Sequence, residues 1–256
     1  MTALRHAQVA WAIVPIENSL EGSVSMTLDL LADGAGDVRI VGEALLRVRH
    51  SLIAGAPVEL AEIETVITHP HVPGQCARFL REELPNARVL PAASTAEAVR
   101  MVSSDADRGR AALGTLLAAS IYGGTVIREG VEDRSDNETR FVWLARDADA
   151  ALSPPFGARA RGAWKTSLHF WGQGAERPGW LLRCLQAFAL REINLTKIES
   201  RPLRRQMGSY MFFLDIAGHV EEASVAEAIA GLGELCEEVR VLGSYRAAVQ
   251  PSPPGV

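Results

Sequence analysis

AIVPIENSLEGSV, residues Ala12–Val24, joins an apolar run to three consecutive polar side chains. The run Ala12–Ile16 has the composition of a buried β-strand, and Glu17, Asn18 and Ser19 follow it directly. Such a strand either reaches the surface at this point or delivers a carboxylate, an amide and a hydroxyl to the mouth of a cleft. The residues that follow favour the second interpretation.

The composition limits the kind of protein. A chain of 256 residues with 48% hydrophobic residues is long enough for one large domain or two ordinary ones. The formal net charge of −5 lacks the positive excess by which nucleic-acid binders attract phosphates. No apolar stretch is long enough to span a membrane, and the first residues lack the apolar core and cleavage site of a signal peptide. We therefore expect a soluble cytoplasmic protein with no nucleic-acid or membrane partner.

The three cysteines, Cys76, Cys184 and Cys236, lie far apart in the sequence and form no CxxC motif. Their odd number and wide spacing are typical of unpaired core thiols in a reducing compartment. His69 and His71 precede Cys76 closely, but the spacing matches no standard zinc site. We expect no metal.

Up to about Arg146 the sequence alternates β-rich runs with helical stretches, which predicts an α/β domain with largely parallel strands. Strands are predicted over Val38–Leu46, Ile63–His69, Ala87–Pro91 and Thr139–Ala145, and helices over Val72–Leu84 and Ser94–Val102. The second helix opens with a capping box, Ser94 followed by Glu97. Ligands of such sheets bind outside the carboxyl ends of the strands, where Glu17-Asn18-Ser19 stands.

A second pattern follows residues 147–163, which carry small residues and two prolines and read as a linker. Strands are predicted over Thr166–Trp171, Ile193–Pro202, Gly208–Gly218 and Val239–Tyr245, and helices over Trp180–Glu192 and Glu221–Leu235. A turn around Arg204–Met207 joins the second and third of these strands. The resulting βαββαβ order is ferredoxin-like. The last residues, 247–256, are predicted to be a disordered tail.

Several short motifs occur in a particular order: VPIENS (Val14–Ser19), HP to QC (His69–Cys76), STA (Ser94–Ala96), NETRF (Asn137–Phe141) and ESRP (Glu199–Pro202). In this order and spacing the chain resembles a monofunctional prephenate dehydratase, a catalytic domain followed by an ACT regulatory domain. The resemblance implies a two-lobed, periplasmic-binding-protein-like domain over 1–146 and a ferredoxin-like ACT domain over 164–246. Members of the family ordinarily begin with a strand and a GPxGTF-like loop. That segment does not precede Val14 here, so we expect the catalytic domain to be incomplete at its N-terminus.

The resemblance implies conversion of prephenate to phenylpyruvate with loss of water and carbon dioxide, without a metal or organic cofactor. Thr139 is the residue expected to donate to the departing hydroxyl, and Arg140 is expected to bind the substrate carboxylates or to hold the site's geometry. Phe141 is a candidate substrate contact, although strand alternation turns it away from Arg140 and favours packing. Read alone, Thr-Arg-Phe is also the composition of an ordinary strand.

Neutral polar groups complete the expected substrate site. Asn18 and Ser19 are donors suited to a carboxylate or a ring hydroxyl, or alternatively the N-cap of a helix starting near Ser23. Glu17 is expected to form a salt bridge with an arginine rather than to face a dianion. Thr68 matches the family's Ser/Thr-His-Pro turn beside the cleft, and Thr95 is explained equally by the cleft and by helix capping.

By the same resemblance, L-phenylalanine binds the ACT domain as an inhibitor. The residues expected to take part are Gly179, Trp180 and Leu181 at the start of a helix, and Glu199, Ser200, Arg201 and Pro202 at the end of a strand. Trp180 stands where the family has a small residue, in a motif that normally reads GALV, and its indole has the size to fill the ring pocket. The alternative is a domain that only dimerises through its sheet. A homodimer or homotetramer is expected.

Three alternatives remain open at the level of sequence. Arogenate dehydratase differs in a substrate amino group that no identified residue distinguishes. A non-catalytic phenylalanine-binding regulatory protein would keep the ACT domain and a damaged catalytic domain. A periplasmic-type ligand-binding protein shares the two-lobed plan but requires a signal peptide.

Overall fold

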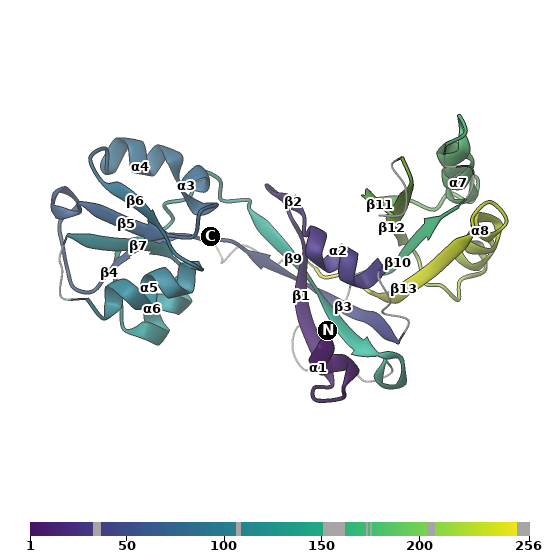
Figure 1. Cartoon of the computed structure of the whole chain (residues 1–256), viewed down its shortest axis with the longest axis horizontal. Helices are drawn as coiled ribbons and strands as arrows, with labels where there is room; N and C mark the ends of the chain where they lie inside the picture. The colour runs from purple at the N-terminus through teal and green to yellow at the C-terminus, as the bar shows by residue number, and fades with distance from the viewer. Residues whose placement is uncertain are drawn as a thin grey trace. The chain divides into compact units, whose positions relative to one another are not determined.

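The protein is described by a computed structural model, which places residues 1–32, 37–105, 109–150, 162–172, 174, 176–203 and 208–249. These residues form two compact units, one of residues 1–46 with those from 138 onward, the other of residues 47–137 (Figure 1). Most of the predicted linker, the turn at 204–207 and residues 250–256 of the predicted tail lie outside the described residues.

The unit of residues 47–137 is built on a five-stranded sheet in the order β6-β5-β7-β4-β8. Its strands are β4 (Ser51–Ala54), β5 (Thr65–Thr68), β6 (Arg88–Pro91), β7 (Arg110–Gly114) and β8 (Thr125–Arg128). β5 runs parallel to β6 and β7, whereas β4 runs antiparallel to β7 and β8. The predicted strands β5 and β6 are parallel as expected, whereas β4, which was not predicted, runs antiparallel to its neighbours. A strand buried on both faces is apolar throughout whichever way it runs, so its direction cannot be read from its composition.

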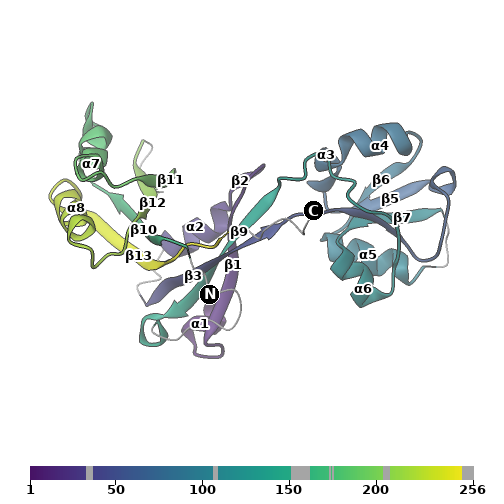
Figure 2. The same ribbon diagram turned by 180° about the vertical axis from the view of Figure 1, so that it is seen from behind.

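Helices cover both faces of this sheet, α3 (Val72–Gln75) and α4 (Ala77–Glu83) on one side, α5 (Thr95–Ser103) and α6 (Leu116–Tyr122) on the other (Figure 2). A short 3₁₀ turn, η1 (Leu60–Glu62), precedes β5. The single helix predicted over Val72–Leu84 is wrong, because Cys76 leaves helical geometry (φ −123°, ψ 26°) and divides it. The predicted capping box is confirmed in part: the Ser94 hydroxyl accepts from the Glu97 N–H at 3.0 Å.

The other unit contains a sheet in the order β2-β1-β9-β3. Its elements are α1 (Thr2–Arg5), β1 (Trp11–Asn18), β2 (Gly22–Ser23), α2 (Ser25–Ala32), β3 (Val38–Arg47), β9 (Glu138–Arg146) and the 3₁₀ turn η2 (Asp147–Asp149). β1 and β9 are antiparallel, with Asn18 opposite Thr139 and a register shift between Pro15 and Glu17. This pairing joins the first and last parts of the predicted catalytic domain.

A second sheet of this unit has the order β11-β12-β10-β13 and is antiparallel in its pairings. It arises from β10 (Trp164–Trp171), α7 (Trp180–Ala189), β11 (Leu195–Pro202), β12 (Tyr210–Ala217), α8 (Ala223–Gly233) and β13 (Glu238–Arg246), a βαββαβ series. Its helices lie on one face around a core that contains Leu168, Phe170, Phe188 and Leu232. Residues of the opposite face, such as Phe213 and Leu242, share a core with Ile16, Leu28 and Ile40 of β1, α2 and β3.

The backbone that follows β13 is held by hydrogen bonds. Ala247 donates its N–H to the carbonyl of Ala163, and Ala248 donates to the Glu43 carboxylate at 2.9 Å. The prediction of a disordered tail from residue 247 is therefore wrong for these two residues, because the backbone beyond β13 has fixed partners.

Among the described residues, no helix combines the length and the apolar character needed to cross a membrane.

Candidate functional site

The ends of β1 and β9 bring the polar residues of VPIENS and NETRF together. The Asn18 side-chain N–H donates to the Thr139 hydroxyl oxygen at 3.0 Å and to the Glu138 carbonyl at 3.3 Å. Ser19 accepts from the Glu138 N–H through its hydroxyl at 3.0 Å and donates its own N–H to the Glu138 carbonyl at 2.9 Å. Two segments about 120 residues apart thus form one polar cluster, which we call the strand-end cluster (Asn18, Ser19, Glu138 and Thr139).

Asn18 orients Thr139 rather than a helix. Its side-chain carbonyl accepts from the N–H groups of Leu20 and Glu21 at 2.9 and 3.0 Å, so it closes a turn after β1, while α2 begins only at Ser25. The alternative that Asn18 or Ser19 caps the helix near Ser23 is therefore wrong. Because Thr139 accepts a hydrogen bond from Asn18, its own hydroxyl hydrogen can be donated elsewhere.

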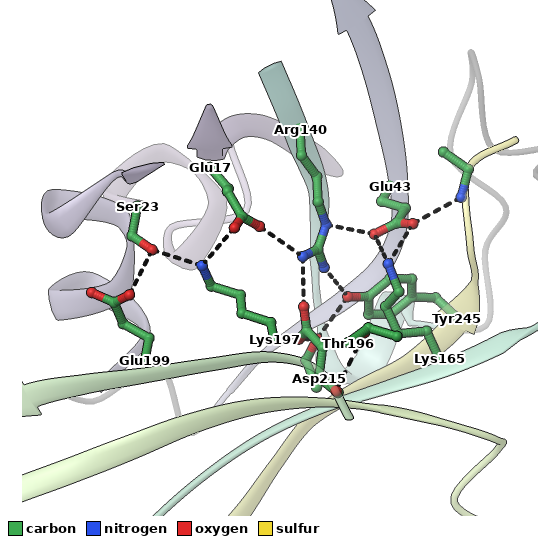
Figure 3. Close-up of polar contacts among 12 residues, drawn as sticks. Glu17, Ser23, Glu43, Arg140, Lys165, Thr196, Lys197, Glu199, Asp215 and Tyr245 are labelled. Atoms are coloured by element: carbon green, nitrogen blue, oxygen red, sulfur yellow. Dashed lines mark hydrogen bonds and ion pairs between the residues drawn. The ribbon is translucent and has the colours of Figure 1, made fainter. Parts of the chain in front are cut away.

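Arg140 follows Thr139 on β9 and points into a buried polar network, drawn in Figure 3. Its guanidinium donates to Glu43 at 2.7 Å, to Asp215 at 2.5 Å and to the Tyr245 hydroxyl at 2.9 Å. Glu17 lies 3.5 Å from the same guanidinium, which confirms the predicted salt bridge between Glu17 and an arginine. We call Arg140 with Glu43, Asp215 and Tyr245 the arginine network.

The electrostatics of the arginine network follow from its burial. Burial alone disfavours the charged guanidinium of Arg140, but Tyr245, Asp215 and Glu43 outweigh it and raise its pKa. Burial, reinforced by Asp215, raises the pKa of Tyr245, so its hydroxyl stays protonated. Lys165 adds a second cation, 2.9 Å from Glu43. Arg140 is thus a fixed charge whose donors are directed to residues of the protein.

A second set of contacts connects β11 to β1, β2 and α2. Lys197 lies 3.1 Å from Glu17 and donates to the Ser23 hydroxyl at 2.6 Å, and Ser23 donates to Glu199 at 2.9 Å (Figure 3). Arg201 forms an ion pair with Asp29 of α2 at 2.8 Å. β11 therefore directs alternate side chains toward β1, which carries VPIENS, and toward β2 and α2, which follow it.

The predicted effector residues divide between two environments. The Trp180 indole packs against Phe170 and Phe212 and donates its N–H to the Leu235 carbonyl at 3.0 Å, inside the core of the βαββαβ series. Gly179 precedes it with φ 78°, a left-handed conformation that favours glycine, and Leu181 packs against the same core. Glu199 and Arg201 face Ser23 and Asp29 instead, while Ser200 and Pro202 are exposed.

Thr68 and Thr95 belong to the other unit. The Thr68 hydroxyl is fully buried and donates to the Leu113 carbonyl at 2.8 Å, so its hydrogen is used within the protein. Thr95 is half-buried at the first position of α5, and Phe141 of β9 is half-buried opposite Pro15.

The His69 and His71 rings stack with their centroids 5.1 Å apart, and no group of three potential metal ligands occurs among the described residues.

Sequence reasoning missed a buried polar cluster of the second unit. The Gln75 side-chain carbonyl lies 3.1 Å from both the Asn137 side-chain nitrogen and His50 Nε2. Asn137 also accepts the Val48 N–H through its backbone carbonyl at 2.8 Å. Gln75 and Asn137 each lie within a motif noted in the sequence, and these motifs could have pointed to them. Only the fold shows that the two residues meet. The cluster fixes the backbone two residues before Thr139.

Comparisons with known proteins agree over nearly the whole chain. A family model described as prephenate dehydratase matches residues 1–149. A prephenate dehydratase of Mycobacterium sp. (strain JLS) is 41% identical over 256 residues, covering 99% of this chain and 77% of the relative. One from Amycolatopsis methanolica is 40% identical over 248 residues, covering 97% of this chain and 77% of that protein.

Two solved structures are similar to the whole chain. A prephenate dehydratase from Arthrobacter aurescens in complex with L-Phe has a TM-score of 0.82 and 37% identity, covering 100% of this chain and 80% of that one. A protein described as a novel type of quorum quenching acylase has a TM-score of 0.81 and 30% identity, covering 96% and 85% of the two chains.

Proposed function

The chain belongs to the prephenate dehydratase family, and we propose that it converts prephenate to phenylpyruvate through a reaction assisted by Thr139. It is an enzyme with prephenate dehydratase activity, as the family model and the relatives support. The observation that carries the proposed role of Thr139 is its hydrogen bond from Asn18, since this contact leaves the threonine hydrogen to be donated to substrate.

The reaction needs help chiefly at the leaving group. The bond between the ring carbon and the hydroxyl breaks with its electron pair on oxygen, which takes up a proton and leaves as water. The ring carboxylate leaves as carbon dioxide, and its bonding electrons complete the aromatic ring. A hydrogen bond from Thr139 to the departing oxygen stabilises the negative charge that develops there. Assistance of this kind contributes about 10²–10⁴ in rate.

Arg140 was expected either to bind the substrate carboxylates or to hold the geometry of the site, and we assign it the second role. Its donors are engaged by Glu43, Asp215 and Tyr245, so it anchors β9 next to Thr139 and is not assigned a substrate carboxylate. Ser19 remains a proposed polar contact for substrate, whereas Asn18, whose amide donates to Thr139 and Glu138, is proposed to position Thr139. Thr95 and Phe141 remain predictions. Thr68 loses support as a contact because its hydroxyl is buried and bonded to Leu113.

We further propose that residues 164–246 are an ACT domain that binds L-phenylalanine and inhibits the enzyme. The A. aurescens relative is described in complex with L-Phe, and its structure is similar to this chain throughout. Gly179, Leu181, Ser200 and Pro202 remain candidate contacts. Trp180 is buried in the domain's own core, so its indole supports the pocket from within.

Contacts between the ESRP strand and β1 supply a physical link for this inhibition. Lys197 joins Glu17, and Glu17 in turn faces Arg140, the neighbour of Thr139. If the effector binds more tightly to one conformation of Lys197, Glu17 and Arg140 than to another, it shifts the enzyme toward that conformation. We propose a cytoplasmic homo-oligomer, and the exposed side chain of Ile198 on the edge strand β11 supports the association of chains.

The test of the catalytic proposal compares Thr139→Val with Thr139→Ser. The valine variant keeps the shape of the side chain without the hydroxyl, and its kcat for phenylpyruvate formation from prephenate is expected to fall by about 10²–10⁴. The serine variant keeps the donor and is expected to retain most of the activity. Both should match the wild type in circular dichroism. A valine variant within about threefold of wild-type kcat would contradict the role of Thr139.

The same assay, run with arogenate and with added L-phenylalanine, separates the remaining alternatives. Faster turnover of arogenate would assign the substrate to the amino-bearing analogue. Inhibition by L-phenylalanine but not by D-phenylalanine supports the proposed effector site. A folded wild-type chain that binds L-phenylalanine in calorimetry but turns over neither substrate would identify a binding protein.

A further inference from the structure

Two of the three cysteines meet in the folded chain. Cys184 of α7 and Cys236, two residues before β13, are separated by 52 positions in the sequence, yet their sulfur atoms lie 3.9 Å apart. All three cysteines are free, as expected, but their wide spacing in the sequence gave no sign that two of them meet. Sulfur atoms in a disulfide lie about 2.05 Å apart, so the two must approach by roughly 2 Å to form one.

Neighbouring contacts hold the two cysteines against each other. One turn before Cys184, the Trp180 indole donates to the carbonyl of Leu235, the residue preceding Cys236. On the other side, the Glu237 N–H donates to the Trp171 carbonyl at 3.0 Å. The backbone on either side of Cys236 is thus fixed beside α7, which keeps the thiols close without a covalent bond.

The two thiols differ in access and in acidity. Cys184 is fully buried, whereas Cys236 is half-buried and is the sulfur that a small oxidant reaches first. The two sulfur atoms lie within hydrogen-bond distance, and either thiol can be the donor. This bond lowers the pKa of Cys184 against the opposing effect of burial, and it raises the pKa of Cys236.

We propose that Cys184 and Cys236 form a redox-modification site, at which a hydroperoxide such as hydrogen peroxide generates an intrachain disulfide. The Cys184 thiolate takes the proton of Cys236, and the Cys236 sulfur attacks the peroxide. The O–O bond breaks to give a sulfenic acid at Cys236 and hydroxide, which takes the proton from Cys184 and leaves as one water. The Cys184 thiolate then attacks the sulfenic sulfur, forming the S–S bond and releasing a second water after protonation. Two thiols are oxidised by two electrons, and one peroxide is reduced to two waters.

Cys76 provides an internal control. It is fully buried among apolar residues of the other unit, and burial, together with the charges of Asp133 and Glu132, raises its pKa to about 12. A thiol with so little thiolate, shut off from solvent and without a neighbouring cysteine to take its proton, reacts slowly with peroxide. Cys76 should therefore stay reduced while the pair is oxidised.

The test uses the full chain, reduced and then freed of reductant, with one equivalent of hydrogen peroxide. Thiols are counted under denaturing conditions, and non-reducing peptide mapping locates any bond. We expect loss of two of the three thiols, a mass lower by two hydrogen atoms, a peptide linking Cys184 to Cys236, and full recovery with dithiothreitol. The Cys76→Ala variant should form the same bond, whereas Cys184→Ala and Cys236→Ala should not.

Three results would overturn the proposal. The first is persistence of all three thiols after excess peroxide. The second is their conversion to sulfinic acid without a crosslink, and the third is a bond between chains in place of the intrachain one. Because Cys184→Ala and Cys236→Ala each retain the other thiol, they also show whether either cysteine reacts without its partner.

Discussion

Asn18 uses both ends of its amide, donating to Thr139 and accepting from the turn that follows β1. In Asn18→Asp the carboxylate still accepts from the turn but cannot donate, so Thr139 must give its hydrogen to Asp instead of to the substrate. We expect kcat to fall by about 10- to 100-fold with little change in the unfolding midpoint. Steady-state kinetics and thermal unfolding measure the two quantities. Unchanged kcat would mean that the orientation of Thr139 does not depend on Asn18.

Arg140 stabilises the fold because it neutralises carboxylates that have no access to water. Arg140→Met keeps the bulk but leaves Glu43 and Asp215 without their shared cation, and we expect the free energy of unfolding to fall by about 3–5 kcal/mol. Adding Asp215→Asn should recover part of the loss. Arg134→Met, which removes an exposed pair with Asp136, is the matched control and should leave denaturant unfolding nearly unchanged.

At the scale of elements, the break between α3 and α4 positions Gln75 beside Asn137. Gln75→Met keeps the length of the side chain but removes its carbonyl, to which the Asn137 side-chain N–H donates at 3.1 Å. We expect a loss of about 1–3 kcal/mol in unfolding free energy. A fall in kcat should accompany it, since Asn137 precedes Thr139 by two residues. Gln186→Met, at an exposed position of α7, is the control. Equal effects of the two substitutions would show that the cluster contributes nothing.

The start of α7 depends on Trp180, which fills the core of its own domain. Trp180→Ala removes the packing against Phe170 and Phe212 and is expected to cost about 3–5 kcal/mol. Binding of L-phenylalanine should weaken more than prephenate turnover, because the damage is confined to the βαββαβ series. Calorimetry and kinetics on Trp180→Ala and Trp180→Phe test this. If the alanine variant binds L-phenylalanine as the wild type does, the proposed pocket is not next to α7.

At the scale of the whole molecule, stability should depend on pH through His169. Its side chain is 1% exposed, neither ring nitrogen has a hydrogen-bond partner among the described residues, and burial lowers its pKa from 6.5 to about 4. Between these values the unfolded chain binds the proton more tightly than the folded chain does. The free energy of unfolding therefore falls as the pH drops from 6.5 to 4, by up to about 3 kcal/mol.

Denaturant unfolding of the wild type and of His169→Phe between pH 7 and 4 measures this contribution. The variant cannot take up the proton, so its stability should fall less steeply over the same interval. His6→Gln, a change at an exposed histidine, should keep the wild-type slope. Equal slopes for wild type and His169→Phe would show that another group governs the acid sensitivity.

Local chemistry in the sequence determined much of this structure. Apolar runs between polar segments located the strands β3, β5, β6 and β9, and Ser94 with Glu97 located the start of α5. The order of the short motifs indicated the family, because each motif is a continuous stretch. These features depend on neighbouring residues alone, so they can be read without the fold.

Only the tertiary structure decided the direction of β4, the partners of Arg140 and the meeting of Cys184 with Cys236. A buried strand is apolar in either direction. The residues around an arginine in a strand are the same whether its guanidinium faces substrate or three groups of the protein. The contact between Asn18 and Thr139 likewise depends on the register of two strands 121 residues apart. Contacts between residues far apart in the sequence are set by packing and hydrogen bonding in the folded chain. The residues next to each partner do not predict them.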